Sequence, residues 1–152
     1  TPGPVDIDYP ALLDAPSPRL KAYPPETVVA EKFEALVSIG IANSRMKDFY
    51  DLWMIAQTFQ FQRQVLSTAL RRTFERRGTP WPQEHPTGLT DAFAREKDRM
   101  WRAFLKRERL GAAPEDMSRV LTDLRAFLGP VLEDDLIYES WQPGGPWLET
   151  AE

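Results

Sequence analysis

The sequence contains no cysteine and only one histidine, His85. These absences exclude a disulfide framework, a cysteine-based zinc site and a histidine-rich metal site. Carboxylates are the side chains that remain as ligands for a metal ion, and they favour Mg²⁺ or Mn²⁺. Because His85 stands among prolines, we expect a surface or loop-packing histidine rather than a general base.

Long apolar runs are also lacking, because charged residues interrupt each of them before it reaches the length of a membrane span. The first four residues, Thr-Pro-Gly-Pro, have neither the basic region nor the apolar region of a signal peptide. We therefore expect a soluble, cytoplasmic protein that contacts no membrane. The sequence does not begin with Met, and we expect it to be a processed or truncated piece of a longer protein.

Charge is unevenly distributed along the 152 residues, whose net charge is −4. Residues 1–61 contain 5 Lys and Arg against 8 Asp and Glu, residues 62–109 contain 12 against 6, and residues 110–152 contain 2 against 9. The basic middle segment is a candidate for contact with polyphosphate or RNA. Alternatively, the acidic C-terminal segment folds over it, and charge patterning alone does not choose between these arrangements.

Apolar spacing and capping residues predict a mainly α protein, a single domain over residues 1–152 with about five helices in residues 24–152. The expected helices cover residues 24–40, a segment that begins near 45, residues 61–77, residues 90–110 and a segment from Pro114 onward. Asn43 and Ser44 are candidate N-caps for the second helix. In the last helix, Gly129-Pro130 predicts a kink or a break.

Three segments are expected to lie outside the helices. Residues 1–23 are rich in proline, which favours an extended arm or a strand remnant. Residues 78–89 have the composition of a loop. The run Pro-Gly-Gly-Pro at 143–146 predicts that residues 139–152 form an irregular tail, whose two tryptophans pack back onto the helices.

One lysine falls on the apolar side of the first expected helix. At 100° per residue, this side consists of Val28, Val29, Phe33, Leu36, Val37 and Ile39. Lys32 lies within that stripe, whereas the opposite side, where we expect solvated residues, carries Glu31, Glu34 and Ser38. An unpaired buried ammonium group is too costly to keep. Lys32 therefore either extends to an edge or is held against an acidic partner or a phosphate.

The second expected helix carries two acids near its beginning. Asp48 and Asp51 are three residues apart, which makes them neighbours on a helix surface, and Lys47 lies beside them. The connection between the two helices is short, so Lys32 should come close to this end of the second helix. Such a cluster needs a compensating environment, which is either a salt-bridge network or a catalytic site.

Two runs in this region carry a family resemblance. They are Tyr-Pro-Pro-Glu-Thr-Val-Val-Ala-Glu-Lys at 23–32 and Asn-Ser-Arg-Met-Lys-Asp-Phe-Tyr-Asp-Leu at 43–52. They resemble the second half of the AbiEii/AbiGii toxin family of bacterial nucleotidyltransferases, and the resemblance continues more loosely to residues 141–147. It implies that the extended N-terminal segment is a short β remnant of a nucleotidyltransferase-like α/β domain.

In that family, an N-terminal sheet carries a Gly-Ser or Gly-Thr turn and an Asp-x-Asp pair, which bind metal and nucleotide. We do not find this half in the chain. The run Asp6-Ile7-Asp8 imitates the pair, but only Thr-Pro-Gly-Pro precedes it, so we expect Asp6 and Asp8 to have no catalytic role. The resemblance implies Mg²⁺ as cofactor, with most of its ligands absent from this chain.

The resemblance also implies an activity, namely transfer of a nucleotide from an NTP to an RNA or protein acceptor in a toxin-antitoxin or abortive-infection system. Lys32 then corresponds to the lysine that contacts the triphosphate, and Asp48 to the later motif aspartate. Both are candidate catalytic residues. The candidate substrate-binding residues are Arg45, Lys47 and Asp51. The implied partners are an NTP, a tRNA or another RNA, and a cognate antitoxin.

Two alternatives to this interpretation stay open. A buried ion network of Lys32 with Asp48 or Asp51 would have the same sequence pattern without any ligand. On the level of the whole chain, the alternative is a truncated, non-catalytic helical module that binds a protein partner or RNA.

Overall fold

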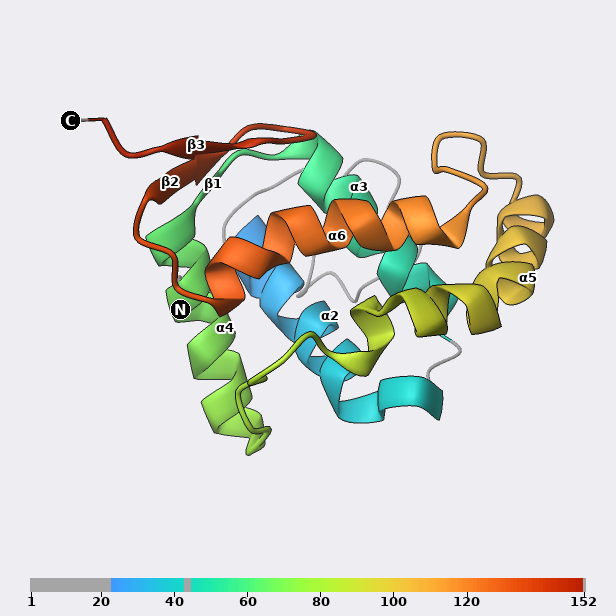
Figure 1. Cartoon of the computed structure of the whole chain (residues 1–152), viewed down its shortest axis with the longest axis horizontal. Helices are drawn as coiled ribbons and strands as arrows, with labels where there is room; N and C mark the ends of the chain where they lie inside the picture. The colour runs from blue at the N-terminus through green and yellow to red at the C-terminus, as the bar shows by residue number, and fades with distance from the viewer. Residues whose placement is uncertain (1–22, 43–44, 152) are drawn as a thin grey trace.

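The structure is a computed structural model that describes residues 23–42 and 45–151. Within this part of the chain, five α-helices are joined by two short 3₁₀ helices and three strands (Figure 1). The α-helices are α2 (Pro25–Ile39), α3 (Met46–Thr58), α4 (Arg63–Arg77), α5 (Asp91–Glu108) and α6 (Met117–Leu132). The 3₁₀ helices are η1 (Gly40–Ala42) and η2 (Thr87–Leu89), and the strands are β1 (Phe61–Gln62), β2 (Tyr138–Trp141) and β3 (Trp147–Glu149).

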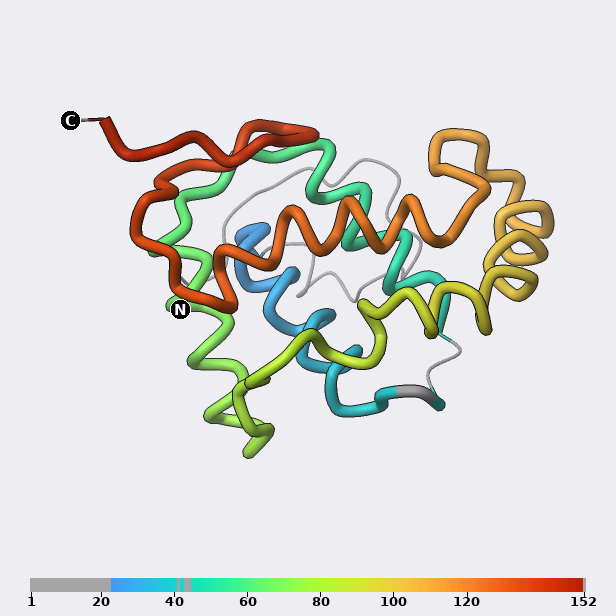
Figure 2. Tube along the Cα trace, viewed as in Figure 1, coloured from blue at the N-terminus to red at the C-terminus, as the bar shows by residue number. Residues whose placement is uncertain are grey.

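The expected mainly α fold is confirmed. A core of buried apolar side chains joins the five helices and the small sheet. Helix α6 runs through the middle of the molecule, from the end where α5 lies to the end where the sheet lies (Figure 2). None of the described helices is both long and apolar enough to cross a bilayer. The expected N-terminal arm, residues 1–23, falls outside the described residues except for its last one, and so do Asp6 and Asp8.

Helix α2 has the bounds that its sequence predicts. It begins at Pro25, where the missing N–H of proline costs no hydrogen bond, and Glu26 lies in its first turn. It ends at Gly40, which adopts a φ of 65° that is favourable only for glycine, and whose N–H donates to the carbonyl of Leu36. The side of α2 that carries Lys32 is buried against the rest of the protein.

Helix α3 is buried on most sides, as its apolar composition predicts. It begins at Met46, and Arg45 occupies the N-cap position without a capping hydrogen bond from its side chain. The predicted caps, Asn43 and Ser44, lie outside the described residues. Nine of the thirteen residues of α3 are buried, and Asp48 and Asp51 are among them. The carboxylates of these two aspartates therefore need partners inside the protein.

The boundary before α4 differs from the expected one. Phe61 and Gln62, predicted as the first helical residues, instead form β1, which pairs with Trp141 and Ser140 of β2. The ring centroid of Phe61 lies 5.2 Å from that of Phe127. Tertiary pairing with a distant strand therefore outweighs the local helical pattern at this position.

The last helix begins later than predicted and continues past the expected break. It begins at Met117, because Asp116 acts as the N-cap and accepts a hydrogen bond from the amide of Ser118. The chain stays helical through Gly129 and Pro130 to Leu132. Of the two expected outcomes, the break does not occur, since a proline in the last turn does not end the helix before Leu132, whereas the kink stays a prediction.

The expectation of an irregular tail over residues 139–152 is wrong as well. Strands β2 and β3 pair antiparallel, with Trp141 opposite Trp147, and β2 also pairs with β1. Gly144 and Gly145 adopt φ angles of 83° and 89° in the connection. Glycine accommodates these angles without strain, so the chain reverses between the prolines and leaves the flanking residues free to form strands.

The two tryptophans of this hairpin do pack onto the helices, as expected. The indole N–H of Trp141 donates to the carbonyl of Ala56 at 2.8 Å, and that of Trp147 donates to the carbonyl of Phe127 at 2.9 Å. Both side chains are buried. The hairpin therefore closes one end of the helical core.

Candidate phosphate-binding site

Lys32 is held between two carboxylates. Its Nζ atom lies 3.1 Å from Oδ1 of Asp48 and 3.2 Å from Oδ2 of Asp51. The lysine is 5% exposed, and the two aspartates are 1% and 0% exposed. The prediction that Lys32 lies on an apolar helix side beside this acid pair is confirmed. The roles assigned to these residues remain predictions.

Arg45 contributes a second cation to the same cluster. Its Nε atom lies 2.9 Å from Oδ2 of Asp48, and its side chain is 45% exposed. Two cations thus face two carboxylates, which compensates much of the cost of removing these charges from water. Lys47, the remaining candidate of this region, lies on the exposed side of α3.

The carboxylate of Asp51 also affects its neighbour Tyr50. Burial raises the pKa of the Tyr50 hydroxyl, and the negative charge of Asp51 raises it further. Tyr50 therefore stays neutral in the alkaline range, and its ring centroid lies 6.4 Å from that of Phe104.

A pocket of about 190 Å³ opens beside Lys32. We call it the Lys32 pocket, and it is lined by Val28, Glu31, Lys32, Glu34, Ala35, Arg45, Asp48 and Arg77. Pockets for whole drug-sized ligands usually exceed roughly 300 Å³. This one is large enough for a phosphate group but not for a complete nucleotide, so the rest of a nucleotide would extend out of it.

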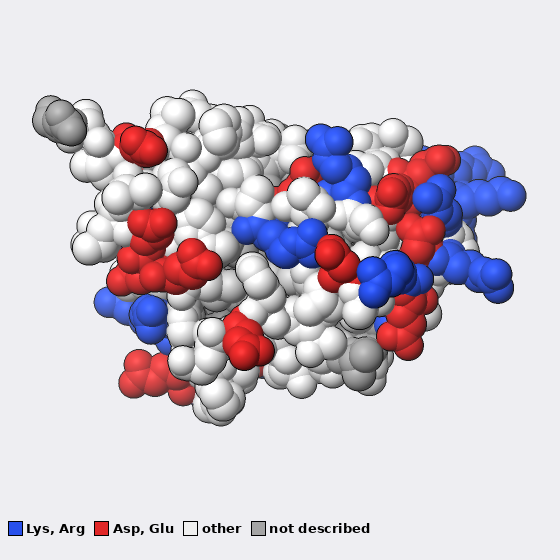
Figure 3. Space-filling view, in the orientation of Figure 1, with Lys and Arg blue, Asp and Glu red and all other residues white. Residues whose placement is uncertain are grey.

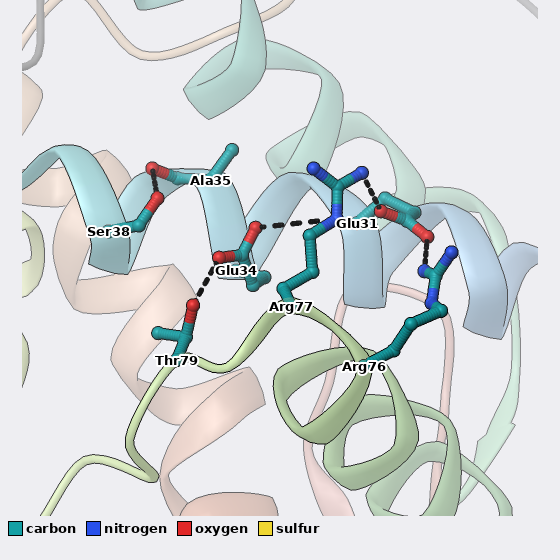
Figure 4. A network of polar contacts seen from close by, with 7 residues as sticks. All are labelled: Glu31, Glu34, Ala35, Ser38, Arg76, Arg77 and Thr79. Carbon is teal, nitrogen blue, oxygen red and sulfur yellow. Dashed lines mark hydrogen bonds and ion pairs between the residues drawn. The ribbon is translucent and has the colours of Figure 1, made fainter.

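A second ion network borders this pocket (Figure 4). Glu31 of α2 forms ion pairs with Arg76 and with Arg77 Nη2, the latter at 2.8 Å, from the last turn of α4. Glu34 accepts a hydrogen bond from the hydroxyl of Thr79 at 2.6 Å and lies 4.0 Å from Nε of Arg77. Glu34 is only 4% exposed.

The expectation that this side of α2 is solvated is therefore wrong for Glu34. The C-terminal end of α4, which supplies cations, and Thr79, two residues after it, which supplies a hydroxyl group, cover this part of α2. Forty-five residues separate Glu34 from Thr79 in the sequence, and no local pattern marks them as partners. The run of arginines at the end of α4 was the one available signal, since consecutive cations require anions nearby.

Comparison with known proteins identifies the family. Residues 1–128 match the nucleotidyl transferase AbiEii toxin family of type IV toxin-antitoxin systems. The chain belongs to the AbiEii toxin family. No curated protein and no solved structure matches it. The family description implies a nucleotide substrate and an antitoxin partner, and it agrees with the resemblance found in the sequence.

The AbiEii match includes every residue that lines the Lys32 pocket. It ends inside α6, so β2 and β3 follow the matched segment. The ion cluster around Lys32 therefore belongs to the part of the chain that resembles the toxins. The hairpin that closes the core lies outside the matched residues.

The Mg²⁺ ion implied by the AbiEii family does not fit the described residues. Among them, no three acidic or histidine side chains are grouped so as to hold a metal ion. Asp48 and Asp51 lie close together, but Lys32 and Arg45 already neutralise them. A carboxylate pair that carries its own cations is a poor ligand set for a divalent ion.

Cations of the basic middle segment of this AbiEii chain pair with acids of the C-terminal segment, Arg63 with Asp134 and Arg102 with Glu115. Arg63 is 8% exposed and donates to the carboxylate of Asp134 at 2.5 Å and to the carbonyl of Tyr138 at 3.0 Å. On the exposed surface, the cations of α5 alternate with acids at the far end of the molecule (Figure 3). His85 is exposed, as predicted.

Proposed function

We propose that this chain provides the phosphate-binding part of a toxin nucleotidyltransferase, which transfers a nucleotide from an NTP to an RNA or protein acceptor. The observation that carries the proposal is the ammonium group of Lys32, which is held between Asp48 and Asp51 beside a pocket of phosphate size. Membership in the AbiEii family supports the reaction type.

Lys32 would act on the triphosphate. Nucleotidyl transfer releases pyrophosphate, and a cation fixed in a water-poor environment stabilises the negative charge that develops on this leaving group. Two carboxylates already hold the ammonium group in place, so its position is fixed before a phosphate approaches. Loss of one such preorganised group typically lowers a turnover rate by about 10²–10³-fold.

Asp48 would position the cations of the site. One of its oxygens contacts Lys32 and the other contacts Arg45, so a single carboxylate fixes both groups relative to the pocket. Asp51 supports Lys32 from the buried side. We propose that Arg45 contacts the phosphates, because it lines the pocket. Lys47 lies on the exposed side of α3 and would contact the outer part of the substrate or the acceptor.

The acceptor and the cofactor are the less defined parts of this proposal. An RNA acceptor, such as a tRNA, is favoured by the excess of cations in residues 62–109, since phosphate backbones bind to basic segments. The Mg²⁺ requirement remains a prediction, and no step is assigned to a metal ion because the described carboxylates do not fit one. A nucleotide substrate would place the reaction in the cytoplasm.

A second candidate function is a non-catalytic helical module that binds a protein partner or RNA. The observation that favours it is the internal balance of the ion cluster. Lys32, Arg45, Asp48 and Asp51 satisfy one another without a ligand, so burial of the lysine has a purely structural explanation.

A transfer assay separates these two functions. The chain is incubated with labelled NTPs, Mg²⁺ and tRNA, and compared with Lys32→Met and with Arg119→Met as a control, because Arg119 is an exposed cation of α6 outside the Lys32 pocket. Label transfer that is lost in Lys32→Met and kept in Arg119→Met supports the transferase. Absence of transfer by the unmodified chain, together with retained binding of tRNA, supports the non-catalytic module. The near-UV circular dichroism of each variant shows whether it is folded.

A further inference from the structure

The cations around the Lys32 pocket are all engaged by carboxylates. Those that line the pocket are Lys32, Arg45 and Arg77. Lys32 contacts Asp48 and Asp51, Arg45 contacts Asp48, and Arg77 contacts Glu31. A polyphosphate that enters the pocket must therefore compete with a carboxylate for at least one cation, and the ion pair that opens most easily decides where it binds.

The ion pairs differ strongly in exposure. The side chains of Lys32 and Asp48 are 6% and 2% exposed, whereas those of Arg77 and Glu31 are 54% and 22% exposed. A buried pair is costly to separate because each charge is left without water. An exposed pair contributes little to stability, because water replaces its partners. Arg45 is 45% exposed, but its partner Asp48 is buried. Arg77, whose partner is also partly exposed, is therefore the cation that leaves its carboxylate at the lowest cost.

The position of Arg77 suits this exchange. It is the last residue of α4 and reaches over α2 toward Glu31 and Glu34 (Figure 4). Its guanidinium group forms a short contact with Glu31 and only a distant one, 4.0 Å, with Glu34. An arginine has five N–H donors in a planar arrangement that matches two phosphate oxygens. The neighbouring Arg76 also pairs with Glu31 but does not line the pocket.

We propose that Arg77 is a second phosphate ligand of the Lys32 pocket, and that Glu31 holds the Arg77 guanidinium group until a nucleoside triphosphate binds. The triphosphate displaces Glu31 from Arg77 and is then held between Arg77 and Lys32, which both line the pocket. This inference rests on the proposed function, since it assigns the same pocket to the polyphosphate chain of a nucleotide.

In this arrangement, the carboxylate of Glu31 competes with the substrate for Arg77 and thereby lowers the affinity of the pocket for the substrate. Its carboxylate occupies Arg77 in the empty pocket and repels an incoming phosphate. Replacement of Glu31 by Gln keeps the size of the side chain but removes the charge. Such a variant should bind polyphosphate more tightly, a gain that damage to the fold would not produce.

The test measures binding of inorganic tripolyphosphate to the complete 152-residue chain by isothermal titration calorimetry at low ionic strength. Arg77→Ala should weaken binding by about tenfold, the usual effect of losing one charge-assisted contact. Arg72→Ala is the matched control, because Arg72 is an exposed arginine of the same helix outside the pocket. It should weaken binding by less than about twofold. Glu31→Gln should tighten binding by about three- to fivefold.

A double variant shows whether Glu31 acts through Arg77. The gain from Glu31→Gln should largely disappear in an Arg77→Ala background, because the group that Glu31 occupies is then missing. The inference is overturned when Arg77→Ala and Arg72→Ala bind equally, or when the Glu31→Gln gain persists undiminished without Arg77.

A Lys32→Met variant keeps the two proposals distinguishable. If this variant binds more weakly while Arg77→Ala binds normally, the proposed function stands and the inference about Arg77 fails. If Arg77→Ala alone weakens binding, Arg77 is a phosphate ligand and the role of Lys32 fails. Absence of tripolyphosphate binding by the unmodified chain overturns both.

Discussion

The Nζ atom of Lys32 lies 3.1 Å from Oδ1 of Asp48, and both side chains are almost completely removed from solvent. This contact joins α2 to α3 across 16 residues of sequence. Together with the ion pair between Lys32 and Asp51, it fixes the relative position of two helices whose apolar contacts are less directional. The ion cluster therefore matters for the fold as well as for the proposed chemistry.

We expect Lys32→Met to destabilise the protein by about 3–5 kcal/mol, because it leaves Asp48 and Asp51 buried without their cation. Arg45→Met should cost at most about 1 kcal/mol, since Arg45 is half exposed and water can replace it. Urea unfolding followed by circular dichroism measures both free energies. Equal stability of Lys32→Met and the unmodified protein would contradict the structural role of this cluster.

The hairpin connection gives a second prediction. A Cβ atom added at Gly145 would lie 2.8 Å from the indole ring of Trp141, and the φ of Gly145 is 89°. We therefore expect Gly145→Ala to cost about 2 kcal/mol or more through strain and displacement of the ring. Gly111→Ala is the control, because nothing lies within 4 Å of the new methyl group there. Thermal unfolding should separate the two variants, and equal midpoints would refute the prediction.

The aromatic cluster under the sheet gives a third prediction. Phe127 is fully buried, and its ring centroid lies 5.2 Å from that of Phe61 and 4.9 Å from that of Trp141. Phe127→Ala should cost about 3–5 kcal/mol, because the cavity cannot close between rings held by the sheet and helix. Val65→Ala, at a position that is 42% exposed, should change stability by no more than about 0.5 kcal/mol. Chemical denaturation of the two variants provides the comparison.

A fourth prediction concerns pH. Partial burial opposes ionisation of Asp98, but hydrogen bonds from Arg102 and from the amide of Met117 outweigh it and lower the pKa of Asp98. The unfolded chain therefore binds this proton more tightly. The stabilisation is present above the ordinary pKa of 3.8 and is lost as the pH falls through the lower folded value.

Asp98→Asn should accordingly lower stability by about 1 kcal/mol at neutral pH, a modest value because a third of the side chain is exposed. The difference from the unmodified protein should shrink in acid. Urea denaturation at neutral pH and at a pH below 3.8 measures it. A difference of the same size at both pH values would show that the charge of Asp98 is not responsible.

Much of the helical fold could be predicted from the sequence because its signals are local. The 3.6-residue spacing of apolar side chains, the prolines before α2 and Gly40 after it determine one helix without knowledge of any partner. The odd position of Lys32 was visible for the same reason, since a charge inside an apolar stripe demands a counter-charge. The nearest source of such a counter-charge was the acid pair of α3, Asp48 and Asp51.

The incorrect predictions concern contacts between segments that are far apart in the sequence. Burial of Glu34 depends on Thr79 and Arg77, which approach it only after α4 has packed on α2. The hairpin was missed for another reason. Pro143 and Pro146 locally favour irregular structure, although a five-residue connection that contains glycine is compatible with a hairpin. Phe61 pairs with Trp141, which belongs to that hairpin. The start of α4 could therefore not be predicted correctly without the hairpin.

Trp141 and Trp147 have ring centroids 5.6 Å apart and planes inclined by 59°. Two indoles at this distance and inclination couple their electronic transitions and add a chiral band to the ultraviolet spectrum that no helix contributes. The helix content deduced from that spectrum will be biased by this band. The band is also a fingerprint of the closed hairpin, and its disappearance would show that the hairpin detaches while the helices persist.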